Sequence, residues 1–150
     1  MAALPLESVE RIVPMAQLTC PPGLPSPLEG ILNLGATAVP VLRLDRLLGL
    51  PVQDAGLYSM LIILKGSIGV RFALLVERIS EVLSLCCGDF LPLDREDSFN
   101  ACAEASFPLR GETVPLLSPQ RILMEKETRA LSELQAVAQH RLEEWGAAIR

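Results

Sequence analysis

Short apolar runs separated by turn signals fill the chain up to about residue 123. SMLIILKG at 59–66 and VRFALLVERI at 70–79 are rich in Leu, Ile and Val, and GSIG separates them, which predicts a β-hairpin. TAVPVLRL at 37–44 predicts another strand. Pro40 should lie near an edge or irregularity of that strand, because proline donates no hydrogen bond to a neighbour. These patterns predict a mainly β fold.

Helical patterns are confined to two short segments and the tail. LDRLLGLP and PQRILMEKE predict helical turns, one ended by Gly49 and Pro51 and one begun at Pro119. Residues 124–150 predict an amphipathic α-helix, because apolar residues recur every three or four positions. That stripe consists of Leu131, Leu134, Ala138, Leu142, Trp145 and Ile149. We expect it to bury Trp145, by docking on its own chain, in a dimer seam or on a partner.

Two segments of the chain occur twice, in the same order. VERI stands at 9–12 and again at 76–79, and VPVLRLDRLL at 39–48 matches VPLLSPQRIL at 114–123. This indicates an internal duplication. We therefore expect a domain over 1–123 made of two small β-barrels, roughly 1–52 and 53–123, which are related by a pseudo-two-fold axis and are free to exchange elements.

The two halves differ at their beginnings. In the second half two apolar runs precede VERI, whereas only MAALPLES precedes it in the first. The first barrel is therefore expected to lack its first strand and to leave a bare edge, which a soluble protein has to cover. A strand from a second copy, a partner or the helical tail could cover it, and the first case would make a homodimer.

Composition and charge exclude several classes of protein. The net charge of −5, with no basic cluster, argues against nucleic-acid binding. No apolar run is long enough to span a membrane, and the N-terminus does not resemble a signal peptide. The pattern predicts a soluble, cytoplasmic protein whose core is Leu, Ile and Val, because aromatic residues make up only 4%.

No set of side chains suggests catalysis or metal binding. The four cysteines form no C-x-x-C pair, and His140 is the only histidine. We expect the cysteines to be small buried residues and His140 to be a solvated helix residue. The sequence therefore predicts no metal, no cofactor and no enzymatic activity.

Three segments in order resemble the CheW-like domain family: LEGILNLGATAVPVLRLDRLLGLP at 28–51, FALLVERISEVLSL at 72–85 and GETVPLLSPQRIL at 111–123. The resemblance implies two packed SH3-like five-stranded barrels and a non-catalytic chemotaxis adaptor. Such an adaptor bridges the cytoplasmic tip of a chemoreceptor and the regulatory domain of the histidine kinase CheA. The alternative is a divergent CheW-like regulatory module with another partner, outside the receptor array.

The resemblance also implies where partners bind: receptor helices in an apolar groove between the barrels, and the kinase at barrel ends. The candidate contact residues are Gly30, Ile31, Asn33, Leu34, Gly35, Val76, Ile79 and Val82. Each has a structural alternative, which is a positive-φ turn for Gly30, a backbone hydrogen bond at the turn for Asn33, and the core for the aliphatic residues. The chain departs from the family pattern at Gly35–Ala36, where Arg-Gly is usual, and at Arg43, where aspartate is common.

Overall fold

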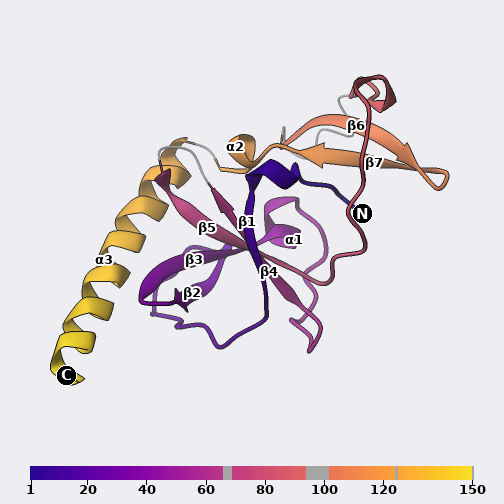
Figure 1. Ribbon diagram of the computed structural model, residues 1–150. Helices are drawn as coiled ribbons and strands as arrows, with labels where there is room; N and C mark the ends of the chain where they lie inside the picture. Colours follow the sequence, from indigo (N-terminus) through magenta and orange to yellow (C-terminus); the bar gives the residue numbers. More distant parts are fainter. Residues whose placement is uncertain (66–68, 94–101, 124, 150) are drawn as a thin grey trace.

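The computed structural model describes residues 1–65, 69–93, 102–123 and 125–149 (Figure 1). The predicted mainly β fold with a C-terminal helix is confirmed. In chain order the elements are η1 (Leu6–Ser8), β1 (Val9–Pro14), β2 (Leu28–Leu34), β3 (Thr37–Arg43), α1 (Leu44–Leu47), β4 (Met60–Lys65), β5 (Arg71–Val76), η3 (Cys87–Asp89), β6 (Ala103–Leu109), β7 (Glu112–Leu117), α2 (Pro119–Ile122) and α3 (Glu125–Ile149).

The larger sheet has five strands in the order β1-β4-β5-β3-β2. The predicted hairpin is present as β4 and β5, and the rest of the GSIG turn before Gly69 lies outside the described residues. β3 pairs in parallel with β5 only from Val41 onward, so Pro40 lies where no donor to β5 is required. β4 and β5, which follow residue 52, pair with β1 and β3 from the first half, so the larger sheet combines elements of both halves.

Alternate side chains of β4 enter two different hydrophobic clusters, as the two-residue period of a strand requires. Leu61 and Ile63 pack in an inner cluster with Leu32, Val39, Val41, Ala73 and Leu75. Ile62 and Leu64 belong to the larger cluster, which also contains residues of β6, β7 and α3. Both faces of this strand are therefore buried.

The smaller sheet is the antiparallel hairpin β6–β7. The N-terminal segment adds to it through a parallel bridge between Ala3 and Leu116, in which the Ala3 N–H donates to the Pro115 carbonyl at 2.9 Å. On the other side, Leu91 and Ser106 form an antiparallel bridge. In Figure 1 this hairpin lies on the opposite side of the molecule from α3.

The duplication is visible in the strand pairing. The second half repeats the unit β2–β3–α1 as β6–β7–α2, with the same separation in sequence throughout. The strand pairing repeats as well: Ile31 pairs with Pro40 in the first hairpin, and the equivalent residues Ser106 and Pro115 pair in the second. Both hairpins also turn through two residues of positive φ, as type I′ turns require. These are Gly35 and Ala36 in the first hairpin and Arg110 and Gly111 in the second.

The predicted equivalence of the two VERI copies is wrong. The first copy lies in β1, whereas the second begins at the last residue of β5 and continues into an extended segment without regular structure. The parallel bridges show which residues of the two halves correspond. Ala3 lies opposite Leu116 of β7, and Ala73 lies opposite Val41, the equivalent residue of β3, so Ala3 corresponds to Ala73. With the same offset in sequence, Glu7 corresponds to Glu77 and Ile12 corresponds to Val82.

Two closed five-stranded barrels, as the resemblance implies, are not found among the described residues. The larger sheet is nevertheless linked across its edges, because the segment after β1 bridges to β2. The Thr19 N–H donates to the Ile31 carbonyl at 2.9 Å, and the Ile31 N–H donates to the Thr19 carbonyl at 2.8 Å. The smaller sheet has only two of the described strands, so it is the half that lacks strands relative to the other.

The helix α3 docks on β3 (Figure 1). Leu131 is buried in the larger cluster, with Leu134 packed beside it. Two glutamines bind the strand backbone: the Gln135 amide donates to the Ala38 carbonyl at 3.1 Å, and the Ala38 N–H donates to Gln139 Oε1 at 2.8 Å. Trp145 is 70% exposed, so it is not buried against its own chain, because the docked part of the stripe ends before it. Its burial in a dimer seam or on a partner stays a prediction.

Candidate functional site

An open groove of about 610 Å³ lies between the N-terminal segment and the extended segment after β5. In Figure 1 that extended segment runs past the N-terminus. Phe107 and Leu116 of the smaller sheet line the groove together with Ile62 of β4. Its other lining residues are Ala3, Leu4, Pro5, Leu6, Glu7, Val9, Ile12, Ile79, Glu81, Val82, Leu83, Ser84, Leu85, Phe90 and Glu104.

The extended segment carries four exposed aliphatic side chains, which are Ile79, Val82, Leu83 and Leu85. One ion pair anchors it to the β6–β7 turn, and a local hydrogen bond shapes the turn that follows it. Arg110 Nη2 lies 2.8 Å from Glu81 Oε1, and the Cys86 N–H donates to Asp89 Oδ2 at 2.7 Å. Of these aliphatic residues, only Ile79 and Val82 were among the sequence candidates. The apolar–polar–apolar order of Leu83, Ser84 and Leu85 is the signal that would have added the two leucines.

The remaining sequence candidates do not form one surface. Ile31 is a core residue, while Leu34 and Val76 are half-buried. Asn33 Oδ1 accepts a hydrogen bond from the Ala36 N–H at 3.1 Å, which is the local backbone role considered for it. Gly35 is exposed at the turn with φ +54°, a conformation that favours glycine.

Gly30 is buried within β2 and does not have positive φ, so the turn interpretation is wrong. The reason for glycine here is close approach of the segment that bridges to β2. A Cβ at this position would lie 2.9 Å from Leu18 Cβ, 3.0 Å from the Thr19 carbonyl oxygen and 3.1 Å from Cys20 Sγ. Any side chain would push that segment away from β2.

Gly30→Ala is expected to lower the free energy of unfolding by about 1–3 kcal/mol, because the added methyl forces the bridging segment off β2. Gly56→Ala is the matched control, since nothing lies within 4 Å of its added Cβ and its φ is not positive. The control should stay within about 0.5 kcal/mol of the parent protein. Equal chemical denaturation curves for the two variants would contradict this packing explanation.

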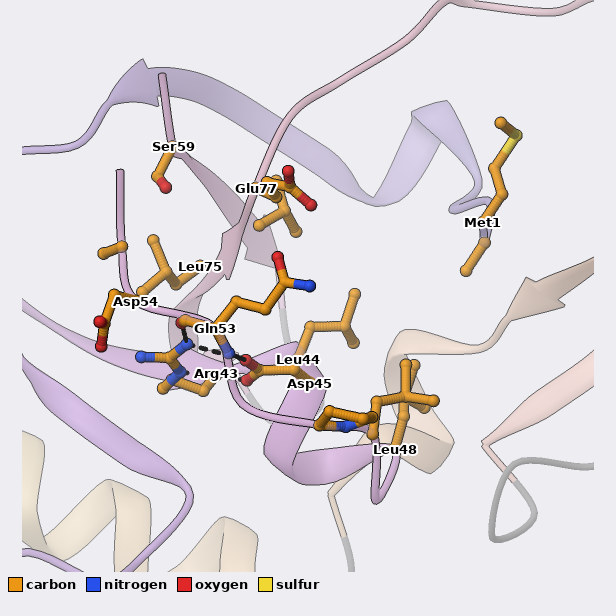
Figure 2. Close-up of a pocket in the computed structure, with 15 residues that line it drawn as sticks. Met1, Arg43, Leu44, Asp45, Leu48, Gln53, Asp54, Ser59, Leu75 and Glu77 are labelled. Atoms are coloured by element: carbon orange, nitrogen blue, oxygen red, sulfur yellow. Dashed lines mark hydrogen bonds and ion pairs between the residues drawn. The ribbon is translucent and has the colours of Figure 1, made fainter. Parts of the chain in front are cut away.

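A second pocket, of about 440 Å³, is organised by Arg43 at the end of β3 (Figure 2). The guanidinium is buried and donates to Asp45 twice, from Nε to Oδ1 at 3.1 Å and from Nη2 to Oδ2 at 2.8 Å. It also donates to the Gln53 carbonyl and lies 3.6 Å from Glu29 Oε1. Arg43 therefore anchors the exposed loop that follows α1.

Arg43 and Asp45 form an ion pair in this pocket, and each keeps the other charged. The hydrogen bond from Arg43 holds the pKa of Asp45 below its ordinary value, and the N–H groups of Arg46 and Gln53 act in the same direction. The same hydrogen bond raises the pKa of Arg43 above its ordinary value. Both groups stay ionised at neutral pH, so neither is a proton donor or acceptor poised for catalysis.

The cysteines divide into two kinds. Cys102 is buried, as expected, and burial raises the pKa of its thiol. Cys20, Cys86 and Cys87 are exposed, so the expectation of burial is wrong for them. In the described part of the chain, no three His, Cys, Asp or Glu residues gather as a metal site would require. Among the same residues, no helix is both long and apolar enough to cross a bilayer.

Comparison with known proteins decides the family. A family model for the CheW-like domain matches residues 1–127. The chain belongs to the CheW-like domain family. The crystal structure of the scaffolding protein TtCheW from Thermoanaerobacter tengcongensis shares this fold, with a TM-score of 0.71 and 21% identity over 81% of this chain and 79% of that chain. No curated protein sequence matches.

Membership explains why the pockets contain no catalytic arrangement. CheW-like proteins are non-catalytic scaffolds of chemotaxis signalling that interact with chemoreceptors and CheA. This CheW-like chain is therefore an adaptor and not an enzyme. Its functional surfaces are those that can contact other proteins. The open groove, which has exposed aliphatic side chains at its rim, is the larger of the two pockets described above.

Proposed function

We propose that this CheW-like protein couples chemoreceptors to a CheA-type histidine kinase at the cytoplasmic tips of the receptors. The observation that carries the proposal is the family match over residues 1–127. The chain also keeps both strand–turn–strand–helix units of the duplicated fold. The proposal assigns one surface to each partner.

The receptor surface is proposed to include Ile12 and Val82. These residues occupy equivalent positions in the two halves, and both side chains are exposed at the rim of the open groove. Ile79 lies on the same segment as Val82. Exposed aliphatic side chains from both halves suit the apolar face of a receptor helix.

The kinase surface is proposed to be a hairpin end. The β2–β3 turn exposes Asn33, Gly35 and Ala36. The equivalent β6–β7 turn presents Arg110–Gly111, so the Arg-Gly pair absent from the first hairpin stands in the second. Arginine is favoured at protein interfaces, which makes the second turn the stronger candidate for kinase contact.

The test is a binding assay with a receptor-tip fragment and a kinase regulatory domain, measured separately. We expect both to bind the parent protein. Val82→Asp should weaken the receptor fragment at least about tenfold, or about 1.4 kcal/mol, and leave the kinase domain unaffected. Val137→Asp is the matched control, because Val137 is an equally apolar, exposed residue on α3.

Binding of neither partner by the folded parent protein would refute the coupling role. That result would favour the alternative of a CheW-like module that works outside the receptor array. Equal weakening by Val82→Asp and Val137→Asp would refute the assignment of the receptor surface.

A further inference from the structure

A third pocket lies between α3 and the domain on which it docks, and we call it the α3 pocket. Its volume is about 280 Å³, and it is partly open to solvent. Ala130, Leu131 and Leu134 line it from α3, while Pro25 and Pro27 line it from the loop before β2. Segments that lie far apart in the sequence therefore form this pocket together, and it exists only while α3 is docked.

The walls of the α3 pocket are apolar. The domain contributes Leu28, Leu42 and Leu47, of which the first two are buried in the larger cluster. Among the described residues that line the pocket, Glu127 is the only one with a charged side chain, and none carries a positive charge. A cavity with such walls takes apolar guests. A bound anion would lose its hydration and find no cation to pair with, so the pocket selects against negatively charged ligands.

The volume of the α3 pocket limits the size of its guest. An apolar cavity of about 150 Å³ holds one benzene molecule. The α3 pocket has roughly twice that volume, so it has room for an aromatic ring that carries a short chain. Because the pocket is partly open, a polar end of such a molecule can stay in water while the ring is buried.

We propose that the α3 pocket binds a small uncharged molecule, with an apolar body the size of an aromatic ring and a two-carbon chain, and that this ligand holds α3 on the domain. The ligand contacts both sides of the pocket only while the helix is docked. A ligand that prefers one conformation shifts the equilibrium toward that conformation. The pocket is separate from the surfaces proposed above for the receptor and the kinase.

The helix can carry the effect of this ligand to the β2–β3 turn. Gln139 Oε1 accepts a hydrogen bond from the Ala38 N–H at 2.8 Å, and Gln139 Nε2 donates to the Ala36 carbonyl at 3.0 Å. α3 runs without a break from Glu125 to Ile149. A ligand that holds the beginning of the helix therefore also favours its contacts with the turn, and occupancy of the pocket restrains both.

A matched pair of small molecules tests the chemistry of the pocket. Phenethyl alcohol is the uncharged probe, and hydrocinnamate carries the same phenylethyl group on a carboxylate. We expect saturable binding of the alcohol to the full chain, with a Kd on the order of 1 mM, followed by the methyl resonances of Leu131 and Leu134. Hydrocinnamate should bind at least about tenfold more weakly. At about ten times its Kd, the alcohol should raise the melting temperature by about 3–6 °C.

Two alanine positions on α3 locate the site. Ala130→Phe should weaken the alcohol at least about tenfold, because Ala130 lines the pocket and the larger side chain occupies part of its volume. Ala136→Phe is the matched control, since Ala136 is equally exposed on the same helix and does not line the pocket. Thermal unfolding without ligand checks that both variants stay folded.

Hydrogen exchange on the parent protein tests the effect on the helix without any variant. The alcohol should slow exchange of the α3 amides beyond the pocket, including those of Gln135 and Gln139. Absence of saturable binding would overturn the proposal, as would equal weakening by the two phenylalanine variants. Binding that leaves exchange in α3 unchanged would also overturn it, because the ligand would then not hold the helix. Neither receptor nor kinase enters these measurements, so their outcome is independent of the adaptor test.

Discussion

Removal of residues 124–150 should lower the free energy of unfolding by about 3–6 kcal/mol, because the truncation exposes one face of the larger cluster. Leu131 is only 3% exposed, and its complete burial alone contributes about 2–3 kcal/mol. Leu134 packs beside it. The melting temperature should fall by more than about 10 °C, and the truncated protein should aggregate, because Leu28 and Leu42 lose their cover.

Point variants divide this loss between apolar and polar contacts. Leu131→Ala should cost about 2–5 kcal/mol. Gln135→Ala combined with Gln139→Ala should cost about 1–3 kcal/mol, because the backbone N–H and C=O of Ala38 lose their partners. Trp145→Ser is the control and should stay within about 0.5 kcal/mol, since Trp145 is mostly exposed.

Calorimetry and light scattering on the truncated chain decide the role of the tail. If that chain stays monomeric and melts at the parent temperature, α3 does not stabilise the domain and serves partners alone. A larger loss from Trp145→Ser than from Leu131→Ala would show that the docked face of the helix is a different one.

The tail shows what periodicity predicts and what it omits. Spacings of three and four correctly predicted a helix with Leu131 and Leu134 on its docked face. The same stripe includes Trp145, which does not dock on its own chain, because periodicity does not show where the supporting surface ends. Ile149 is the last residue of α3, and its side chain lies outside the described part of the structure. Gln139 was missed, since a docking side chain that is polar leaves no apolar signal.

The repeated segments show the same limit. The VP segments were placed correctly because each forms a strand followed by a short helix, which local sequence specifies. VERI was misplaced because strand formation depends on a neighbour. Val9–Pro14 pairs with β4, while the segment after Val76 borders the open groove. The same four residues therefore adopt different structures in the two halves, because the strands beside them differ.

Arg43 was noted only as a departure from the family pattern, and its removal has the second large expected effect. Arg43→Met should lower the free energy of unfolding by about 2–4 kcal/mol at neutral pH, because Asp45 and the Gln53 carbonyl lose a buried donor. Arg46→Met is the matched control. Arg46 is more exposed, and its 3.6 Å ion pair with Glu29 should contribute less than about 1 kcal/mol.

The pH dependence identifies the cause. The folded protein holds the pKa of Asp45 below its unfolded value, which is about 3.9. The stability from this pair is therefore fully present above pH 4 and disappears as pH falls through the folded pKa. The difference in unfolding free energy between the parent protein and Arg43→Met should be constant from pH 7 to 5 and shrink below pH 4. Asp45→Asn should remove this dependence, and a difference that grows on acidification would refute the ion-pair explanation.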